Sequence, residues 1–201
     1  MQNRKELIVR LSKFTVEQIS DACDKLKLVD CIVTTSKSGI KPISSPKPIA
    51  GTAFTVAFHS NSCDKHAAIY KHNRHYLDEV PESSIVAIDC NSNNYFSVWG
   101  GLLSQFAYKH NIAGTVTNGC VRDPEEIKES SYPVFAAGVS PISSNGRYKV
   151  VAVKKPIKLG GIDVAYGDFM LASSSGVAVI KPKDIIKVLA LAENKFIKEK
   201  K

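Results

Sequence analysis

Trp99-Gly100-Gly101-Leu102-Leu103 leads into a helical pattern over 101–111 and a strand pattern over 112–118, and the chain then reads Asn118-Gly119-Cys120-Val121-Arg122-Asp123. Strand and helix in alternation are typical of an α/β fold. Two glycines that open a helix leave backbone N–H groups free at the positive end of the helix dipole, which suits a carboxylate or phosphate. The same glycines would equally relieve crowding at a turn, so the pair alone leaves both interpretations open.

Arg122-Asp123 adds a second candidate element to this stretch. The forked guanidinium of an arginine can hold a carbonyl oxygen that becomes an enolate. A neighbouring carboxylate can hold a hard cation such as Mg²⁺ against the same oxygens. The alternative is structural: Asp123 as helix N-cap, Pro124 at the first position and Glu126 at the third form a good helix start. Local sequence alone favours the cap.

The alternation of helices and strands continues on both sides of this stretch. Thr15-Val16-Glu17-Gln18 is a capping box, which predicts a helix that runs through Leu26. Ser, Pro and Gly between Thr34 and about Gly51 predict a loop. Further strands are predicted over 52–58, 84–89, 133–139, 149–153, 162–166, 169–172 and 177–180, and further helices over 64–77, 123–129 and 183–198. We therefore predict one α/β domain over residues 1–201, with a core of about 15–182 and a basic C-terminal helix over 183–201.

Composition indicates a globular intracellular protein. The chain has 201 residues, of which 44% are hydrophobic, and no apolar run reaches the length of a membrane span. The cysteines are odd in number and scattered, which favours reduced thiols in a cytoplasmic compartment. They are Cys23, Cys31, Cys63, Cys90 and Cys120.

Half of the net charge of +8 comes from one segment, because seven lysines and three acidic residues lie between Lys181 and Lys201. A solvated helix face is the favoured interpretation, since no aromatic stripe for stacking bases accompanies the lysines. Nucleic-acid and membrane binding are not expected. Small anionic substrates are the more plausible partners of a basic protein.

His59, Cys63, His66, His72 and His75 lie within seventeen residues and superficially resemble zinc spacing. On the single helix predicted there, the last four spread around more than one face, so solvated or entrance-lining histidines are the favoured interpretation. The chain has no glycine-rich dinucleotide loop, no P-loop and no G-x-S-x-G elbow, which argues against nucleotide-dependent enzymes and serine hydrolases of these types. Cys120 is interpreted as a small buried hydrophobe, not a nucleophile.

Six motifs of this chain occur in the order and spacing of one family. They are Ile19-Ser20-Asp21-Ala22, His66-Ala67-Ala68-Ile69, Trp99-Gly100-Gly101-Leu102-Leu103, Gly119-Cys120-Val121-Arg122-Asp123, Tyr132-Pro133-Val134-Phe135-Ala136-Ala137-Gly138 and Ser144-Asn145-Gly146-Arg147. Over about Thr15 to Pro182 the chain resembles the family of the 4-hydroxy-4-methyl-2-oxoglutarate aldolases and the regulator of ribonuclease activity A. The motif from Trp99 to Asp123 is the specific one.

The resemblance implies a swivelling β/β/α-type domain that assembles as a homotrimer or hexamer, with the site between subunits. By the family's pattern, main-chain N–H groups of Gly100, Gly101, Leu102 and Leu103 would bind the carboxylate of a pyruvyl group. Arg122 would contact the oxo group of the substrate, and Asp123 would ligate Mg²⁺ or Mn²⁺. The expected activity is that of a metal-dependent lyase, which cleaves 4-hydroxy-2-oxo diacids or decarboxylates oxaloacetate through a metal-stabilised enolate.

One position departs from the family's pattern. Lytic members carry Asp or Glu separated from the Arg-Asp pair by twenty residues, where this chain has Gly101. Aldol cleavage needs a base for the hydroxyl proton and decarboxylation does not, so the departure weakens the aldolase interpretation more. The alternative function is therefore a weakly active or inactive family member that acts as a binding or regulatory protein.

Overall fold

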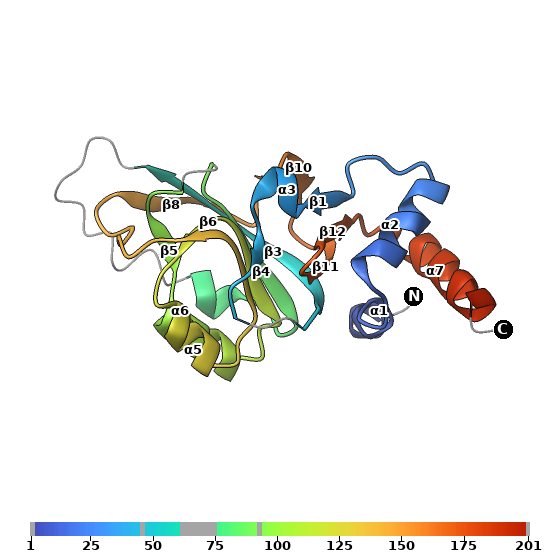
Figure 1. The fold of residues 1–201 in the computed structure, drawn as a ribbon, viewed down its shortest axis with the longest axis horizontal. Helices are drawn as coiled ribbons and strands as arrows, with labels where there is room; N and C mark the ends of the chain where they lie inside the picture. The colour runs from blue at the N-terminus through green and yellow to red at the C-terminus, as the bar shows by residue number, and fades with distance from the viewer. Residues whose placement is uncertain (1–2, 45–46, 61–75, 92–93, 200–201) are drawn as a thin grey trace.

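The computed structural model describes residues 3–44, 47–60, 76–91 and 94–199 (Figure 1). Its helices are α1 (Arg4–Leu11), α2 (Val16–Lys25), α3 (Thr35–Ser38), α5 (Gly101–Lys109), α6 (Pro124–Glu129), α7 (Ile185–Glu199) and the 3-10 helix η1 (Tyr76–Glu79). Its strands are β1 (Ile32–Thr34), β2 (Lys41–Pro42), β3 (Ile49–Ser60), β4 (Ser84–Asp89), β5 (Ser97–Trp99), β6 (Gly114–Val121), β7 (Val134–Val139), β8 (Tyr148–Val153), β9 (Ile157–Leu159), β10 (Ile162–Val164), β11 (Phe169–Ser173) and β12 (Gly176–Ile180).

One mixed sheet organises the described residues, in the order β1-β12-β11-β3-β4-β6-β7-β2, with β5 beside β6 and β8 beside β3. Strands β3, β4, β6 and β7 run parallel to one another, whereas β1, β12 and β11 pair antiparallel. The prediction of an α/β fold with a mixed sheet and flanking helices is confirmed. The strand predicted over 84–89 and the helix predicted over 101–111 correspond closely to β4 and α5.

Side chains of the central strands alternate between two hydrophobic layers, as the pleat of a strand requires. Val86 and Ile88 of β4 face the layer that α5 and α6 cover. Ile85 and Ala87 face the opposite layer, which the β9–β10 hairpin covers. Strands covered on both faces have near-continuous apolar sequences, which explains why β4 was recognisable from its sequence.

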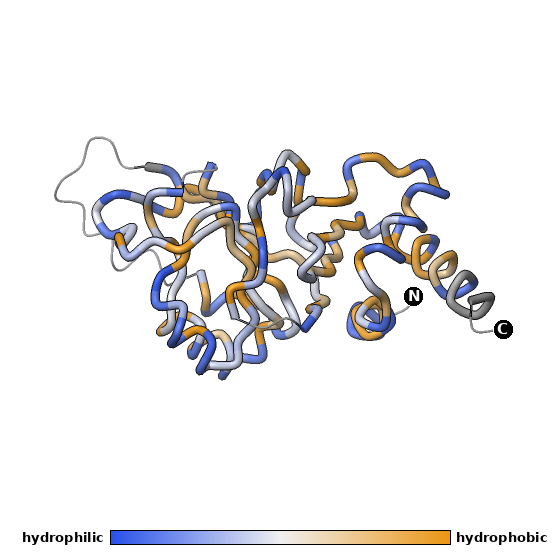
Figure 2. The backbone as a smooth tube through the Cα atoms, in the orientation of Figure 1, coloured by the Kyte–Doolittle hydropathy of each residue, from blue (hydrophilic) through white to orange (hydrophobic). Residues whose placement is uncertain are grey.

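Helices α1, α2 and α7 cover the antiparallel end of the sheet (Figure 1) and share a hydrophobic cluster with β11 and β12. Hydrophobic and hydrophilic residues alternate along these helices (Figure 2), as expected for helices with one buried face. The predicted capping box is confirmed, because Thr15 Oγ1 accepts from Gln18 N at 3.3 Å and Thr15 N donates to Gln18 Oε1 at 3.0 Å. Arg10 of α1 joins α7 through two hydrogen bonds to the Glu193 carboxylate.

The loop predicted from Thr34 to Gly51 is wrong in part, because this segment contains α3, β2 and the start of β3. Helix α3 has only four residues and ends at Gly39 in the left-handed region, with φ 72°. Strand β2 has two residues and exists through its pairing with β7. Elements this short have too few residues to show a period in the sequence. Most of the helix predicted over 64–77 lies outside the described residues, and Tyr76 and Leu77 belong to η1.

The C-terminal helix is confirmed as α7, which starts two residues later than predicted. Within the described part of the chain, no helix combines the length and the apolar character needed to cross a membrane. In α7, Leu189 is completely buried and Ile186 is 53% exposed. The two residues therefore provide one buried and one exposed apolar position of the same helix.

We expect Leu189→Ala to lower the free energy of unfolding by about 2–5 kcal/mol, because it removes a buried side chain and leaves a cavity. Ile186→Ala, at an exposed position, should change it by less than about 0.5 kcal/mol. Urea denaturation of the two variants measures the difference. Equal losses in both variants would contradict the packing of α7 against the end of the sheet.

Candidate functional site

Two strand-to-helix turns lie side by side at one edge of the sheet. Strand β5 ends at Trp99 and leads into α5, whereas β6 ends at Val121 and leads into α6. The strands are parallel, with Trp99 opposite Val121, and Arg122 N donates to Trp99 O at 3.0 Å. Because the carboxyl ends of parallel strands meet at one edge, α5 and α6 begin next to each other and are in contact. The two motifs predicted to share a site are thus adjacent.

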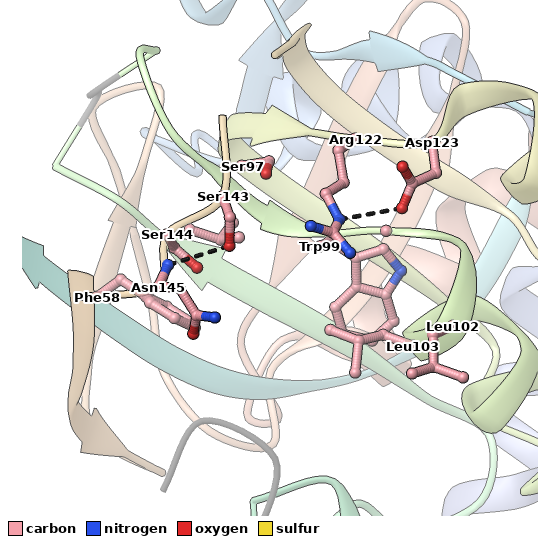
Figure 3. Close-up of a pocket in the computed structure, with 12 residues that line it drawn as sticks. Phe58, Ser97, Trp99, Leu102, Leu103, Arg122, Asp123, Ser143, Ser144 and Asn145 are labelled. Atoms are coloured by element: carbon pink, nitrogen blue, oxygen red, sulfur yellow. Dashed lines mark hydrogen bonds and ion pairs between the residues drawn. The ribbon is translucent and has the colours of Figure 1, made fainter. Parts of the chain in front are cut away.

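A cavity of about 100 Å³ lies at this edge (Figure 3). The residues that line it come from three regions of the chain besides Phe58 of β3. They are Phe58, Ser97, Val98, Trp99, Gly100, Leu102, Leu103, Arg122, Asp123, Ser143, Ser144 and Asn145. All predicted site residues except Gly101 line the cavity.

Arg122 and Asp123 form an ion pair, with 3.0 Å between Arg122 Nε and Asp123 Oδ2. Their side chains are 45% and 34% exposed, so solvent reaches both. A pair this exposed contributes only about 0–1 kcal/mol to stability. Arg122 and Asp123 both line the cavity (Figure 3), and both charges are therefore accessible to a small molecule.

The interpretation of Asp123 as a helix cap, which local sequence favoured, is wrong. Asp123 precedes Pro124 at the start of α6, but its side chain makes no capping hydrogen bond. Its backbone is left-handed, with φ 54° and ψ 50°, and its carboxylate pairs with Arg122 instead. A non-glycine residue in this region costs about 1–3 kcal/mol, and such residues cluster at functional sites.

Gly100 lets the ion pair approach the start of α5. A Cβ added at Gly100 would lie 3.0 Å from both Arg122 Cγ and Asp123 Oδ2, closer than in most side-chain contacts. The crowding that the glycine relieves therefore comes from the site residues themselves. Helix α5 starts at Gly101 without a side-chain cap, and its first helical bond runs from Ser104 N to Gly100 O at 3.1 Å. The preceding N–H groups of this turn have no partner within the helix and suit an anion.

A buried hydrogen-bond chain holds this turn in place. Trp99 Nε1 donates to Ser104 Oγ at 2.9 Å, and Ser104 Oγ donates to Gly100 O at 3.0 Å. Trp99 also stacks on Tyr132, with ring centroids 6.1 Å apart. The tryptophan that precedes the two glycines is thus held in place where it lines the cavity.

The wall opposite Asp123 was not predicted. It consists of Ser143, Ser144 and Asn145, in the loop between β7 and β8 (Figure 3). This loop is held against β5, because Ser97 N donates to Ile142 O at 2.9 Å and Ser144 N donates to Ser97 O at 3.1 Å. The motif Ser144-Asn145-Gly146-Arg147 was the only sequence signal for this wall, and it carried no assigned role.

The sequence analysis also considered Cys120 and a cluster of histidines. Cys120 is buried, its Sγ donates to Asn94 O at 3.0 Å, and burial raises the pKa of its thiol, in agreement with a structural role. Of the histidine cluster, His59 lies on β3 opposite Lys149. The other members, Cys63, His66, His72 and His75, lie outside the described residues.

The RraA-like family model, described as Aldolase/RraA, matches residues 17–179. The chain belongs to this family. Protein DlpA of Legionella pneumophila is 34% identical over 178 residues, which cover 89% of this chain and 28% of DlpA, so the chain spans less than a third of that relative. A "Putative 4-hydroxy-4-methyl-2-oxoglutarate aldolase" of Halalkalibacterium halodurans is 28% identical over 177 residues, which cover 88% of this chain and 77% of the relative.

Among solved structures, the fold matches that of Streptomyces coelicolor RraAS2, described as an unusual member of the RNase ES inhibitor RraA protein family. The TM-score is 0.86, and the match covers 99% of this chain and 97% of RraAS2 at 20% identity. This likeness shows a common fold. The family predicted from the six motifs is confirmed.

The Trp99–Ser104 hydrogen bond generates a prediction for the stability of this turn. Ser104→Ala leaves the buried indole N–H without its acceptor, which should lower the free energy of unfolding by about 1–3 kcal/mol. Gln105→Ala, at an exposed position of α5, should change it by less than about 0.5 kcal/mol. Trp99 is the only tryptophan of the chain, so urea denaturation followed by its fluorescence reports on both variants. Wild-type stability in Ser104→Ala would refute this role of the hydrogen bond.

Proposed function

We propose that this chain is a divalent-metal-dependent lyase that cleaves carbon–carbon bonds in pyruvate-derived 2-oxo acids. It would act as a 4-hydroxy-2-oxo diacid aldolase, an oxaloacetate decarboxylase or both. One observation carries the proposal: the accessible Arg122–Asp123 pair lines a small cavity at the uncapped start of α5. Membership of the RraA-like family and the name of the Halalkalibacterium halodurans relative support it.

The two halves of the site match the two polar ends of a pyruvyl group. Backbone N–H groups over Gly100 to Leu103 would bind its carboxylate, which the helix dipole also favours. Arg122 would donate hydrogen bonds to the oxo oxygen, since its Nε is engaged by Asp123 and its outer nitrogens extend into the cavity (Figure 3). The size of the cavity, about 100 Å³, suits a small acid.

The residues present fit a magnesium-type cation. Among the described residues, no group of three or more acidic, histidine or cysteine side chains could hold a metal, which argues against a cage made only of protein ligands. Mg²⁺ typically binds one or two carboxylates and keeps several waters. Asp123 would hold Mg²⁺ or Mn²⁺ through its partly exposed carboxylate. When bound, the cation would supply positive charge next to the oxygens of the substrate.

The chemistry needs stabilisation of an enolate. In aldol cleavage the hydroxyl proton leaves, the carbon–carbon bond next to the hydroxyl carbon breaks, and the electron pair moves to the oxo oxygen. In oxaloacetate decarboxylation carbon dioxide leaves instead, and no hydroxyl proton is removed. A proton from solvent then converts the enolate into pyruvate. In both reactions Arg122 would stabilise the oxygen most strongly as negative charge develops, which is the condition for lowering the barrier.

Pyruvate release from oxaloacetate and from branched 4-hydroxy-2-oxo diacids, with and without Mg²⁺ or Mn²⁺, tests the proposal. We expect Asp123→Ala to abolish metal-dependent turnover. Arg122→Ala should lower kcat by about 10²–10³-fold, the effect of removing one electrostatic stabiliser.

Glu125→Ala is the matched control, because Glu125 also belongs to the start of α6 but pairs with Lys128 at 3.1 Å on the surface. Its turnover should equal that of the wild type. Wild-type protein without metal-dependent pyruvate release, or full activity in both site variants, would refute the proposed function.

A further inference from the structure

Ser104 lies one helical turn beyond the start of α5, and it is completely buried. Its hydroxyl accepts a hydrogen bond from Trp99 Nε1 at 2.9 Å and donates one to Gly100 O at 3.0 Å. Gly100 O also accepts from Ser104 N at 3.1 Å. Ser104 therefore holds the same carbonyl oxygen twice, once through its backbone and once through its side chain.

The carbonyl of Gly100 and the N–H of Gly101 belong to one planar trans peptide, in which the two bonds point in opposite directions. When Gly100 O is held toward Ser104 along the helix, the N–H of Gly101 is directed out of the start of α5. It is the first of the N–H groups proposed to bind a carboxylate, and such groups have no partner within the helix. The orientation of this one peptide therefore decides where that donor points.

The peptide between Gly100 and Gly101 has little restraint of its own. Glycine adopts more backbone conformations than any other residue, and two glycines flank this peptide. Gly100 precedes the helix in an extended conformation, with φ −171° and ψ −172°, and provides no side-chain cap. The hydroxyl of Ser104 supplies a restraint from the opposite side, within the first turn of the helix.

The restraint continues into the hydrophobic core. An indole N–H can only donate, so Ser104 Oγ accepts from Trp99 and its own hydrogen is left for Gly100 O. Trp99 is fixed in turn, because it is buried and stacks on Tyr132 with ring centroids 6.1 Å apart. The hydroxyl of Tyr132 lies 3.1 Å from Thr115 Oγ1. The direction of the Ser104 hydroxyl is thus set by buried groups.

We infer that Ser104 is a positioning residue for the carboxylate half of the site: together with Trp99 it fixes the first peptide of α5 so that its N–H faces the anion. The inference rests on the proposed function. Ser104 does not line the cavity, so it acts on a ligand only through the peptide between Gly100 and Gly101. Binding groups that are misplaced by about 1 Å can lose up to about 10²-fold in effectiveness.

Calorimetric titration with oxalate in the presence of Mg²⁺ tests the inference without relying on turnover. Ser104→Ala removes the hydroxyl, and we expect the dissociation constant for oxalate to rise by about 10–10²-fold. Ser104→Thr keeps a hydroxyl that can bond to the carbonyl four residues earlier, so its affinity should stay near the wild-type value. An unchanged affinity in Ser104→Ala, or equal losses in the two variants when both are folded, would overturn the inference.

Thr117→Val is the matched control for a general loss of stability. Thr117 Oγ1 is also a buried hydroxyl with a backbone partner, because it accepts from Gly119 N at 3.0 Å, but it belongs to β6 and not to the turn before α5. This variant should lose stability and bind oxalate as the wild type does. A rise of the dissociation constant as large as that in Ser104→Ala would overturn the inference. If Ser104→Ala does not fold, Ser104→Cys, which has only a weak donor, replaces it.

Turnover gives a second readout and separates the two proposals. The carboxylate of the pyruvyl group stays bound from substrate to enolate, so Ser104→Ala should raise KM and change kcat little, whereas Arg122→Ala lowers kcat. A lower kcat at unchanged KM in Ser104→Ala would contradict the positioning role. Wild type that binds oxalate but releases no pyruvate refutes only the proposed function, and the oxalate affinity of Ser104→Ala still decides the inference. Wild type that binds no oxalate overturns both.

Discussion

The parallel pairing of β5 with β6 is the constraint on which the candidate site depends. Trp99 lies opposite Val121, and each strand leads into a helix within three residues of that pair. Parallel strands place their carboxyl ends at the same edge of a sheet, so residues about twenty positions apart in the chain become neighbours. Without this register, the start of α5 and the Arg122–Asp123 pair would not share a cavity.

The close approach of the two turns explains their unusual residues. Gly100 and Gly101 lack side chains where the side chains of α6 and of the residues before it cover the backbone of α5. Asp123 adopts a left-handed backbone that directs its carboxylate to Arg122 instead of the N–H groups of α6. The glycines and the left-handed backbone of Asp123 each reduce the local stability of a helix end. Together they leave the positive charge of Arg122 and the negative charge of Asp123 accessible from the same small cavity. The buried bonds of Ser104 with Trp99 and Gly100 oppose this local cost.

Much of the fold was predictable, because it follows from patterns that repeat over many residues. The buried strand 84–89, the capping box at Thr15 and the helix after Gly100 all carry such patterns and are confirmed. Strand β2 was not predictable, because two residues have no period and the strand depends on β7. Arg122, Asp123 and Gly100 were expected in one site and line one cavity, whereas the capping role that local sequence alone favoured for Asp123 is absent. Its backbone angles depend on tertiary contacts that local propensity does not contain.

The contact of Glu126 from α6 with Gly101 of α5 shows the same limit. The sequence contains a glycine where an acid is expected and, separately, a common helix-start glutamate; only the packing of α5 on α6 connects them. The wall of Ser143, Ser144 and Asn145 likewise reaches the site through a long-range contact with β5.

The most direct test of the account is a crystal structure with Mn²⁺ and oxalate, a stable mimic of the pyruvate enolate. The account predicts an anomalous peak for Mn²⁺ next to the Asp123 carboxylate, with one oxalate carboxylate facing the N–H groups at the start of α5 and the other within reach of Arg122. Mn²⁺ and oxalate bound elsewhere, or a cavity empty of both at saturating concentrations, would contradict it.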